Sequence, residues 1–180
     1  EKTDGMSIVE CEIIPALDKV GVGYEKGSVF LPQLLMSAEA AKASFERIKE
    51  SLKGESSVKR GSIVIATVKG DIHDIGKNIV KLLRENYGFF VTDLGKDVDK
   101  EAVLDAVIRH KAKLVALSAL MTTTVPAMKE TVELLREKAP DCKVIVGGAV
   151  LTEEYAKIIG ADKYGADAME AVRYAESILK

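Results

Sequence analysis

From residue 62 onward the sequence alternates short apolar runs with longer amphipathic stretches, and this alternation restricts the chain to few folds. The apolar runs are rich in β-branched residues and predict strands, which span residues 62–68, 89–93, 114–118, 144–147 and 163–164. The intervening stretches predict helices, which span residues 75–87, 100–111, 125–138, 153–159 and 167–180. Strands that are apolar on both faces and are separated by helices predict a parallel sheet with helices on both sides.

The number of these units indicates a topology. We expect an α/β fold of the flavodoxin-like (Rossmann-type) class, a doubly wound five-stranded parallel sheet with strand order 2-1-3-4-5. In this order the first and third strands are neighbours, so the loops after Val68 and Ser118 share one crevice at the carboxyl ends of the strands. Ligands of such sheets bind in this crevice.

The N-terminal part of the chain follows a different pattern. Apolar residues at helical spacing predict two helices, over residues 8–24 and 30–52, and a polar linker over residues 53–61. We therefore expect a helical segment at residues 1–56 and an α/β domain at residues 57–180.

Composition excludes several classes of protein. The 180 residues are 47% hydrophobic and 30% charged, with a net charge of -2, which excludes a disordered tail and a polycationic nucleic-acid binder. The net charge therefore gives no reason to expect nucleic acid as a partner. No apolar run approaches the roughly 18 residues of a membrane span, so we do not expect a membrane as a partner either. Cys11 and Cys142 are far apart and lack a CxxC neighbourhood, which indicates a reducing, cytoplasmic setting without disulfides or a cysteine zinc site.

The loop after the first predicted strand reads KGDIHDIGKN and does not fit the common phosphate-binding motifs. Five residues, two of them acidic, separate Gly70 from Gly76, whereas a P-loop has four and a following Ser or Thr. The dinucleotide motif GxGxxG is absent. The third strand ends in Ser118, where a phosphoacceptor domain would have aspartate.

His73 is the candidate ligand in this loop. An imidazole can offer one nitrogen to a metal while a carboxylate, here Asp71, holds the other N–H. Ser118, at the end of the adjacent strand, can hydrogen-bond Asp71 and complete a Ser-Asp-His relay, while Gly76 leaves space for a bulky planar ligand. Since a protein metal site needs three or four ligands, the others would arrive with a cofactor. The alternative is that His73 only caps the loop or satisfies a backbone carbonyl.

Three motifs together carry a family resemblance. They are Asp71-x-His73-x-x-Gly76, Ser118-Ala-Leu120 and Gly147-Gly148. This pattern resembles the DxHxxG, SxL and GG signature of cobalamin-binding domains, which bind the cofactor with its own base displaced by a histidine. The stretch from Phe30 to Gln33 resembles the helical cap of the family, so the resemblance covers nearly the whole chain. The likeness is closest to the cobalamin module of methionine synthase, with the corrinoid proteins of methyltransferase systems nearly as close.

The resemblance implies roles for the α/β residues. His73 would be the lower axial ligand of cobalt, and Asp71 and Ser118 would adjust the basicity and proton content of its imidazole. Further cofactor contacts are implied at Gly70, Ile72, Asp74, Gly76, Leu120, Thr122, Gly147 and Gly148. Among these, Gly76, Gly147 and Gly148 would leave room for the nucleotide tail, although an ordinary strand-to-loop turn also explains the last two. Asp167 would contact the tail or cap the last helix, and we favour the cap.

The helical segment resembles the cap over the upper face of the cofactor. Tyr24 stands where methionine synthase has phenylalanine, and Leu31 matches its apolar companion, so both would exclude water from the carbon–cobalt bond. Glu10 resembles an acid that contacts corrin amides, or is an exposed helix carboxylate. The cap usually has four helices, so we expect a truncated cap on a fragment of a longer protein, with exposed apolar surface that promotes self-association. His110 is expected at the surface.

The resemblance implies a methyl carrier that binds methylcobalamin. The first interpretation is a module of methionine synthase, in methionine biosynthesis, that passes methyl groups from methyltetrahydrofolate to homocysteine. Its partners would be the substrate-binding and methyl-donor domains or subunits and a reductive reactivation partner, and the chain alone would not turn over. The alternatives are a stand-alone corrinoid protein of a methylamine, methanol or aryl methyl ether methyltransferase system, a cobalamin-dependent photosensor or regulator, and a mutase subunit.

Overall fold

A computed structural model describes residues 8–51 and 61–179. Within these ranges the chain forms two compact units, one built from the N-terminal helices and one built around a sheet.

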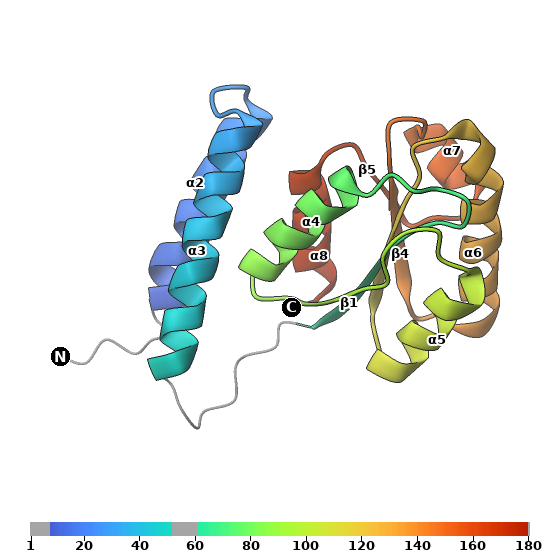
Figure 1. Cartoon of the computed structure of the whole chain (residues 1–180), viewed down its shortest axis with the longest axis horizontal. Helices are drawn as coiled ribbons and strands as arrows, with labels where there is room; N and C mark the ends of the chain where they lie inside the picture. The colour runs from blue at the N-terminus through green and yellow to red at the C-terminus, as the bar shows by residue number, and fades with distance from the viewer. Residues whose placement is uncertain (1–7, 52–60, 180) are drawn as a thin grey trace. The chain divides into compact units, whose positions relative to one another are not determined.

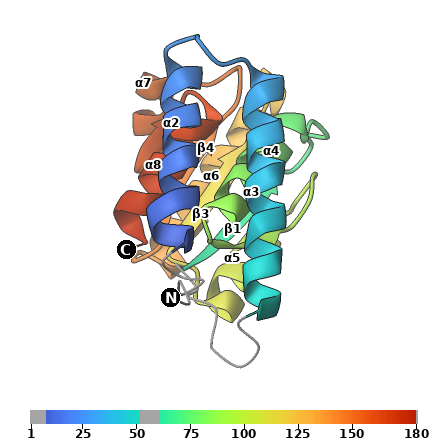
Figure 2. The ribbon, with the colours of Figure 1, turned by 90° about the vertical axis from the view of Figure 1, so that its left-hand side faces the viewer.

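The helical unit consists of a π-helical turn, η1 (Val9–Ile13), followed by α2 (Ile14–Glu25) and α3 (Leu31–Ser51). Figure 2 shows α2 and α3 as two neighbouring rods. Pro32 lies in the first turn of α3, where its missing N–H costs no helical hydrogen bond. Just before it, the backbone N–H of Phe30 donates to the Gln33 side chain over 2.8 Å, as in a capping box. The prediction of two helices is confirmed.

The second unit contains a five-stranded parallel sheet. Its strands are β1 (Ser62–Thr67), β2 (Phe90–Asp93), β3 (Leu114–Ser118), β4 (Lys143–Gly147) and β5 (Lys163–Gly165). They lie in the order β2-β1-β3-β4-β5, which confirms the flavodoxin-like topology. In the register of the sheet Thr67 pairs with Ser118, and Ser118 pairs with Gly147. The carboxyl ends of the three central strands are therefore level.

Helices cover both faces of this sheet. They are α4 (Ile75–Asn86), α5 (Lys100–His110), α6 (Val125–Lys138), α7 (Glu153–Ile158) and α8 (Ala168–Ile178), and a short 3-10 turn, η2 (Thr122–Thr124), precedes α6. Helices α4 and α8 lie on one side of the sheet and α5 and α6 on the other (Figure 1). Arg84 of α4 donates to the Ala171 carbonyl of α8 over 3.2 Å, and Lys100 of α5 bonds Glu130 of α6 over 2.8 Å. This is the doubly wound arrangement expected from the alternation.

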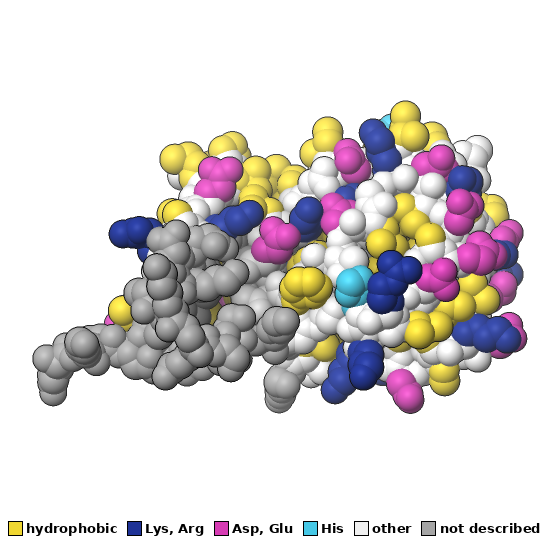
Figure 3. All heavy atoms as spheres, turned by 60° about the horizontal axis from the view of Figure 1, so that its bottom comes forward, with side chains coloured by type: hydrophobic (Ala, Val, Ile, Leu, Met, Phe, Trp, Pro, Cys, Tyr) yellow, Lys and Arg dark blue, Asp and Glu magenta, His cyan; other side chains and the backbone are white. Residues whose placement is uncertain are grey.

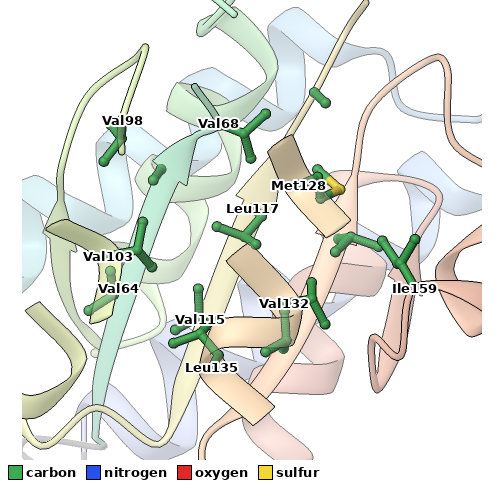
Figure 4. Packing of buried hydrophobic residues seen from close by; sticks show 14 of the residues in the cluster. Val64, Val68, Val98, Val103, Val115, Leu117, Met128, Val132, Leu135 and Ile159 are labelled. Atoms are coloured by element: carbon green, nitrogen blue, oxygen red, sulfur yellow. The ribbon is translucent and has the colours of Figure 1, made fainter. Parts of the chain in front are cut away.

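The core between the sheet and helices α5 and α6 is densely apolar (Figure 4). Val115 and Leu117 of β3 pack in one cluster with Met128, Val132 and Leu135 of α6. Burial of each such side chain stabilises the fold by about 1.5–3 kcal/mol. The strands are consequently fixed, and the loops at their carboxyl ends start from a rigid base.

The surface of the α/β unit carries both charge signs. On the face that Figure 3 shows, basic and acidic side chains are interspersed, in keeping with the net charge of -2. Within the described part of the chain, no helix has both the length and the apolar character that a membrane crossing requires.

Candidate functional site

The three predicted motifs meet at the carboxyl edge of the sheet. Val68, directly after β1, donates from its backbone to the Ser118 carbonyl over 3.1 Å, and Ala119 donates to the Gly147 carbonyl over 3.1 Å. The loop of residues 69–74 leaves the sheet at this edge and leads into α4. The edge of the sheet at which the strand order predicts ligand binding therefore carries the histidine loop.

Asp71 is the buried centre of the site. Its side chain is fully buried, and one carboxylate oxygen, Oδ1, accepts the backbone N–H of His73 over 3.0 Å. The other, Oδ2, accepts the backbone N–H groups of Leu120 and Met121 over 2.7 and 3.3 Å and the Thr124 hydroxyl over 3.0 Å. Burial alone raises the pKa of the Asp71 carboxyl, but the hydrogen bonds from His73, Leu120 and Thr124 outweigh it and hold this pKa well below its usual range. Asp71 is therefore ionised at neutral pH.

The Asp71 carboxylate also orients the imidazole of His73. The ring nitrogen Nδ1 lies 2.8 Å from Asp71 Oδ1. An ionised carboxylate can only accept, so Nδ1 carries the hydrogen and Nε2 keeps its lone pair when the ring is neutral. The side chain of His73 remains 46% exposed. The loop thus presents a half-exposed imidazole with one nitrogen anchored and the other available as a ligand.

Thr124, not Ser118, supplies the hydroxyl that bonds Asp71. In the described part of the chain no hydrogen bond joins the Ser118 side chain to Asp71, so the structure does not show this step of the expected relay, and the role of Ser118 stays a prediction. The reason is the alternation along β3 and its extension: Leu117 and Ala119 face the core of α5 and α6, which directs Ser118 to the opposite face.

The sequence analysis did not identify Thr124, although its place just before a helix with proline in the first turn marks it as a polar N-cap candidate. Its hydroxyl makes no cap hydrogen bond. It lies instead within reach of Asp71 and, at 2.8 Å, of the Met121 carbonyl.

Exposed apolar side chains flank His73. Ile72 is 63% exposed, Ile75 78% and Leu120 42%. A side chain added at Gly76 would meet nothing within 4 Å, so the start of α4 faces open space, as expected. An imidazole set among exposed apolar groups suits a metal carried in a large, largely apolar ring.

The chain alone offers few metal ligands here. Among residues 8–51 and 61–179, no group of three or more His, Cys, Asp or Glu side chains is arranged to hold a metal ion. Both oxygens of Asp71 are already engaged in hydrogen bonds, so His73 and the Asp74 carboxylate are the remaining metal-binding side chains of the loop.

The packing of the backbone explains why glycine stands at positions 147 and 148. Gly148 has a φ of 133°, and a Cβ at this position would lie 1.8 Å from the Ala119 carbonyl oxygen. A Cβ at Gly147 would lie 3.2 Å from the Gly165 carbonyl oxygen. Close approach of neighbouring backbone explains both glycines, as in the strand-to-loop turn considered above, and their contact with a nucleotide tail stays a prediction.

Asp167 caps α8. Its carboxylate accepts the Glu170 backbone N–H over 2.8 Å, and the Glu170 carboxylate accepts the Ala166 N–H over 2.9 Å. The bond from Glu170 to Asp167 is an N-cap, which agrees with the preferred interpretation of Asp167, and the second bond ties the residue before the cap to the first turn of the helix.

The structure places the remaining predicted positions without showing a role for their side chains at the site. Thr122 is exposed at the start of η2, and Asp74 is half-buried in the loop. Tyr24 and Leu31 are half-buried in the helical unit, whereas the Glu10 side chain lies outside the described residues. His110 is partly buried, and its ring centroid lies 6.3 Å from that of Phe90.

A buried ion pair holds the first turn of α4, and the sequence analysis missed it. Lys77 is 3% exposed, and its Nζ donates to the Asp93 carboxylate over 2.6 Å and to Asn78 over 2.8 Å. Burial raises the pKa of Asp93, but the hydrogen bonds from Lys77 and the Gly95 N–H bring it below its usual value. Lysine is so rarely buried that its sequence position gave no signal.

Comparisons with known proteins identify relatives over the whole chain. The family model described as B12 binding domain matches residues 61–173, and a second model of the same description matches residues 3–49. Dimethylamine corrinoid protein 1 of Methanosarcina acetivorans is 41% identical over 179 residues, which cover 98% of this chain and 84% of the relative.

Two solved structures agree with the fold as well. A cobalamin-binding protein from Desulfitobacterium hafniense has a TM-score of 0.85 at 32% identity and covers 98% of this chain and 83% of its own. A chain of the methanol:cobalamin methyltransferase complex from Methanosarcina barkeri has a TM-score of 0.86 at 34% identity, with coverage of 98% and 68%.

These comparisons favour the alternative of a stand-alone corrinoid protein over the module of methionine synthase. They do not support a role in methionine biosynthesis.

The hydrogen bonds to Asp71 predict unequal effects of two hydroxyl deletions. Thr124→Val leaves Asp71 without one of its buried donors, so we expect a loss of about 1–3 kcal/mol in the free energy of unfolding, measured by urea denaturation. Ser118→Ala removes a hydroxyl with no bond to Asp71 and should cost less than about 0.5 kcal/mol. Equal losses in the two variants would contradict the assignment of Thr124.

Proposed function

The chain belongs to the family of B12-binding domains, and on that premise we propose that it is a corrinoid protein that carries methyl groups between partner proteins of a methyltransferase system. Its cofactor is cobalamin. We assign His73 as the residue that would hold the cobalt of this cofactor, through Nε2.

The pairing of His73 with Asp71 is the observation that carries this proposal. The bond of 2.8 Å to Nδ1 leaves Nε2 free to bind a metal, and the side chain is 46% exposed. A corrin ring brings four equatorial nitrogens of its own, so a single protein nitrogen completes a cobalt site where a bare ion would need three or four. The exposed Ile72, Ile75 and Leu120 and the open space at Gly76 suit a broad apolar ring.

The residues around His73 determine which of its ring nitrogens carries the hydrogen. When bound, cobalamin would supply the methyl-transfer chemistry at its metal. The ionised Asp71 keeps the hydrogen on Nδ1 and leaves Nε2 as the nitrogen that can bind a metal. The backbone N–H groups of Leu120 and Met121 and the Thr124 hydroxyl bond the other carboxylate oxygen and so hold Asp71 in this position.

We further propose the remaining contacts and partners. Residues 57–180 would form the cobalamin-binding domain and residues 1–56 the cap, with Tyr24 and Leu31 as its contacts to the cofactor. The methyl donor is a methylamine or methanol, because corrinoid relatives named for dimethylamine and a methanol methyltransferase complex resemble the chain over nearly its whole length. The partners are a methyl-donor subunit, a methyl-acceptor subunit and a reductive reactivation protein.

An absorption titration with methylcobalamin tests the axial ligand. The wild-type protein should give a base-off spectrum with histidine coordination, and His73→Ala should lose that coordination and bind about 10- to 100-fold more weakly. His110→Ala is the matched control, since it removes the second histidine of the chain and should behave as wild type. A base-on spectrum in the wild type, or the same spectrum in wild type and His73→Ala, would contradict the assignment.

A methylation assay tests the methyl donor. The loaded protein is reduced chemically and mixed with a methylamine, methanol or methyltetrahydrofolate, each with a methyltransferase for that donor. Absorption should report methylation of the cofactor from a methylamine or from methanol. Methylation from methyltetrahydrofolate alone would contradict the proposed system.

A further inference from the structure

A second loop, residues 94–99 after β2, braces the histidine loop. The backbone N–H of Gly70 donates to the Asp97 carboxylate over 2.8 Å. In return, the backbone N–H of Asp97 donates to the Asp71 carbonyl over 2.9 Å. Asp97 thus bonds two successive residues of the histidine loop: its side chain bonds Gly70, and its backbone N–H bonds Asp71.

The conformation of Asp97 suits this double contact. Its φ is 57°, and within the described ranges only Lys111 is another non-glycine residue with positive φ. Aspartate and asparagine are among the side chains that adopt this left-handed region most readily. Gly70, on the other side of the contact, has a φ of 82°. Two turns of unusual backbone geometry therefore face each other, joined by hydrogen bonds.

The neighbouring backbone continues this brace. Val98 forms a parallel bridge with Val68, and its N–H donates to the Thr67 carbonyl over 3.1 Å. The Asp71 N–H donates to the Val68 carbonyl over 3.1 Å. Both backbone groups of Asp71 are thus hydrogen-bonded, its N–H to Val68 just after β1 and its carbonyl to Asp97.

We infer that Asp97 is a positioning residue that fixes the main chain at Gly70 and Asp71, so that the Asp71 carboxylate holds His73 in its ligand orientation. This inference rests on the proposed role of His73. The Gly70 N–H is the main cause of the lowered pKa of Asp97, in keeping with a carboxylate that accepts this bond.

The ion pair of Asp97 with Lys69 is too exposed to hold the Asp97 loop against the histidine loop. Lys69 Nζ lies 3.5 Å from Asp97 and 3.3 Å from Asp99, and all three side chains are at least half exposed. Exposed pairs of this kind contribute little. Asp99 shares Lys69 but has no hydrogen bond to Gly70 or Asp71, and it makes no side-chain cap on α5. Asp99→Ala is therefore the control for loss of a carboxylate beside Lys69.

Three variants and two measurements test the inference. Asp97→Gly keeps the left-handed backbone and loses the acceptor, whereas Asp97→Asn keeps both. Hydrogen exchange of the Gly70 amide in the cofactor-free protein should be about 10-fold faster in Asp97→Gly. Methylcobalamin should bind that variant about 10-fold more weakly, with less of the histidine-coordinated spectrum. Asp97→Asn and Asp99→Ala should stay within about 2-fold of wild type in both measurements.

The outcomes separate the two proposals. A wild-type protein that binds methylcobalamin without histidine coordination refutes the role of His73, and the Gly70 exchange rate still tests the brace. The inference about Asp97 is overturned if Asp97→Gly matches wild type in Gly70 exchange, or in methylcobalamin affinity and spectrum. It is also overturned if Asp99→Ala impairs binding as much as Asp97→Gly.

Discussion

The buried carboxylate of Asp71 is the constraint on which the rest of the site depends. A charge with no solvent exposure is tolerated only when hydrogen bonds replace the lost water. Asp71 obtains them from its own loop at His73, from the backbone at Leu120 and Met121, and from Thr124 at the start of α6. The same bonds fix the tautomer of His73 and join two loops of the sheet. Ligand orientation and local stability thus have one cause.

The sheet makes this meeting of loops geometrically available. Because all five strands are parallel and β1 lies beside β3, the loop with Asp71 and the loop with Leu120 leave the same edge at the same level. The apolar core against α5 and α6 fixes the strands beneath them. His73 lies in a loop at the carboxyl edge of the sheet, where its side chain remains half exposed and accessible to a cofactor.

The sequence predicted those features that depend on periodicity or on short local spacing. Strand order followed from five alternating units, the Asp71–His73 pair from its two-residue spacing, and the cap at Asp167 from its position before α8. Contacts that depend on the path of a loop could not be predicted. The Thr124 hydroxyl bonds Asp71, whereas the Ser118 side chain points to the other face of the sheet. Gly148 is needed because a side chain there would collide with the Ala119 carbonyl. The DxHxxG, SxL and GG motifs were taken as common to methionine synthase and corrinoid proteins, so they could not separate the two settings.

In the proposed site a histidine nitrogen of this chain would bind cobalt. Electron paramagnetic resonance of the protein loaded with cobalamin in its paramagnetic cobalt(II) state tests this directly, because a coordinated nitrogen splits the cobalt lines. In protein grown with 15N-labelled histidine, each three-line splitting should become a two-line splitting. An unchanged three-line pattern in the labelled protein would show that the nitrogen belongs to the cofactor's own base, and would refute the assignment of His73.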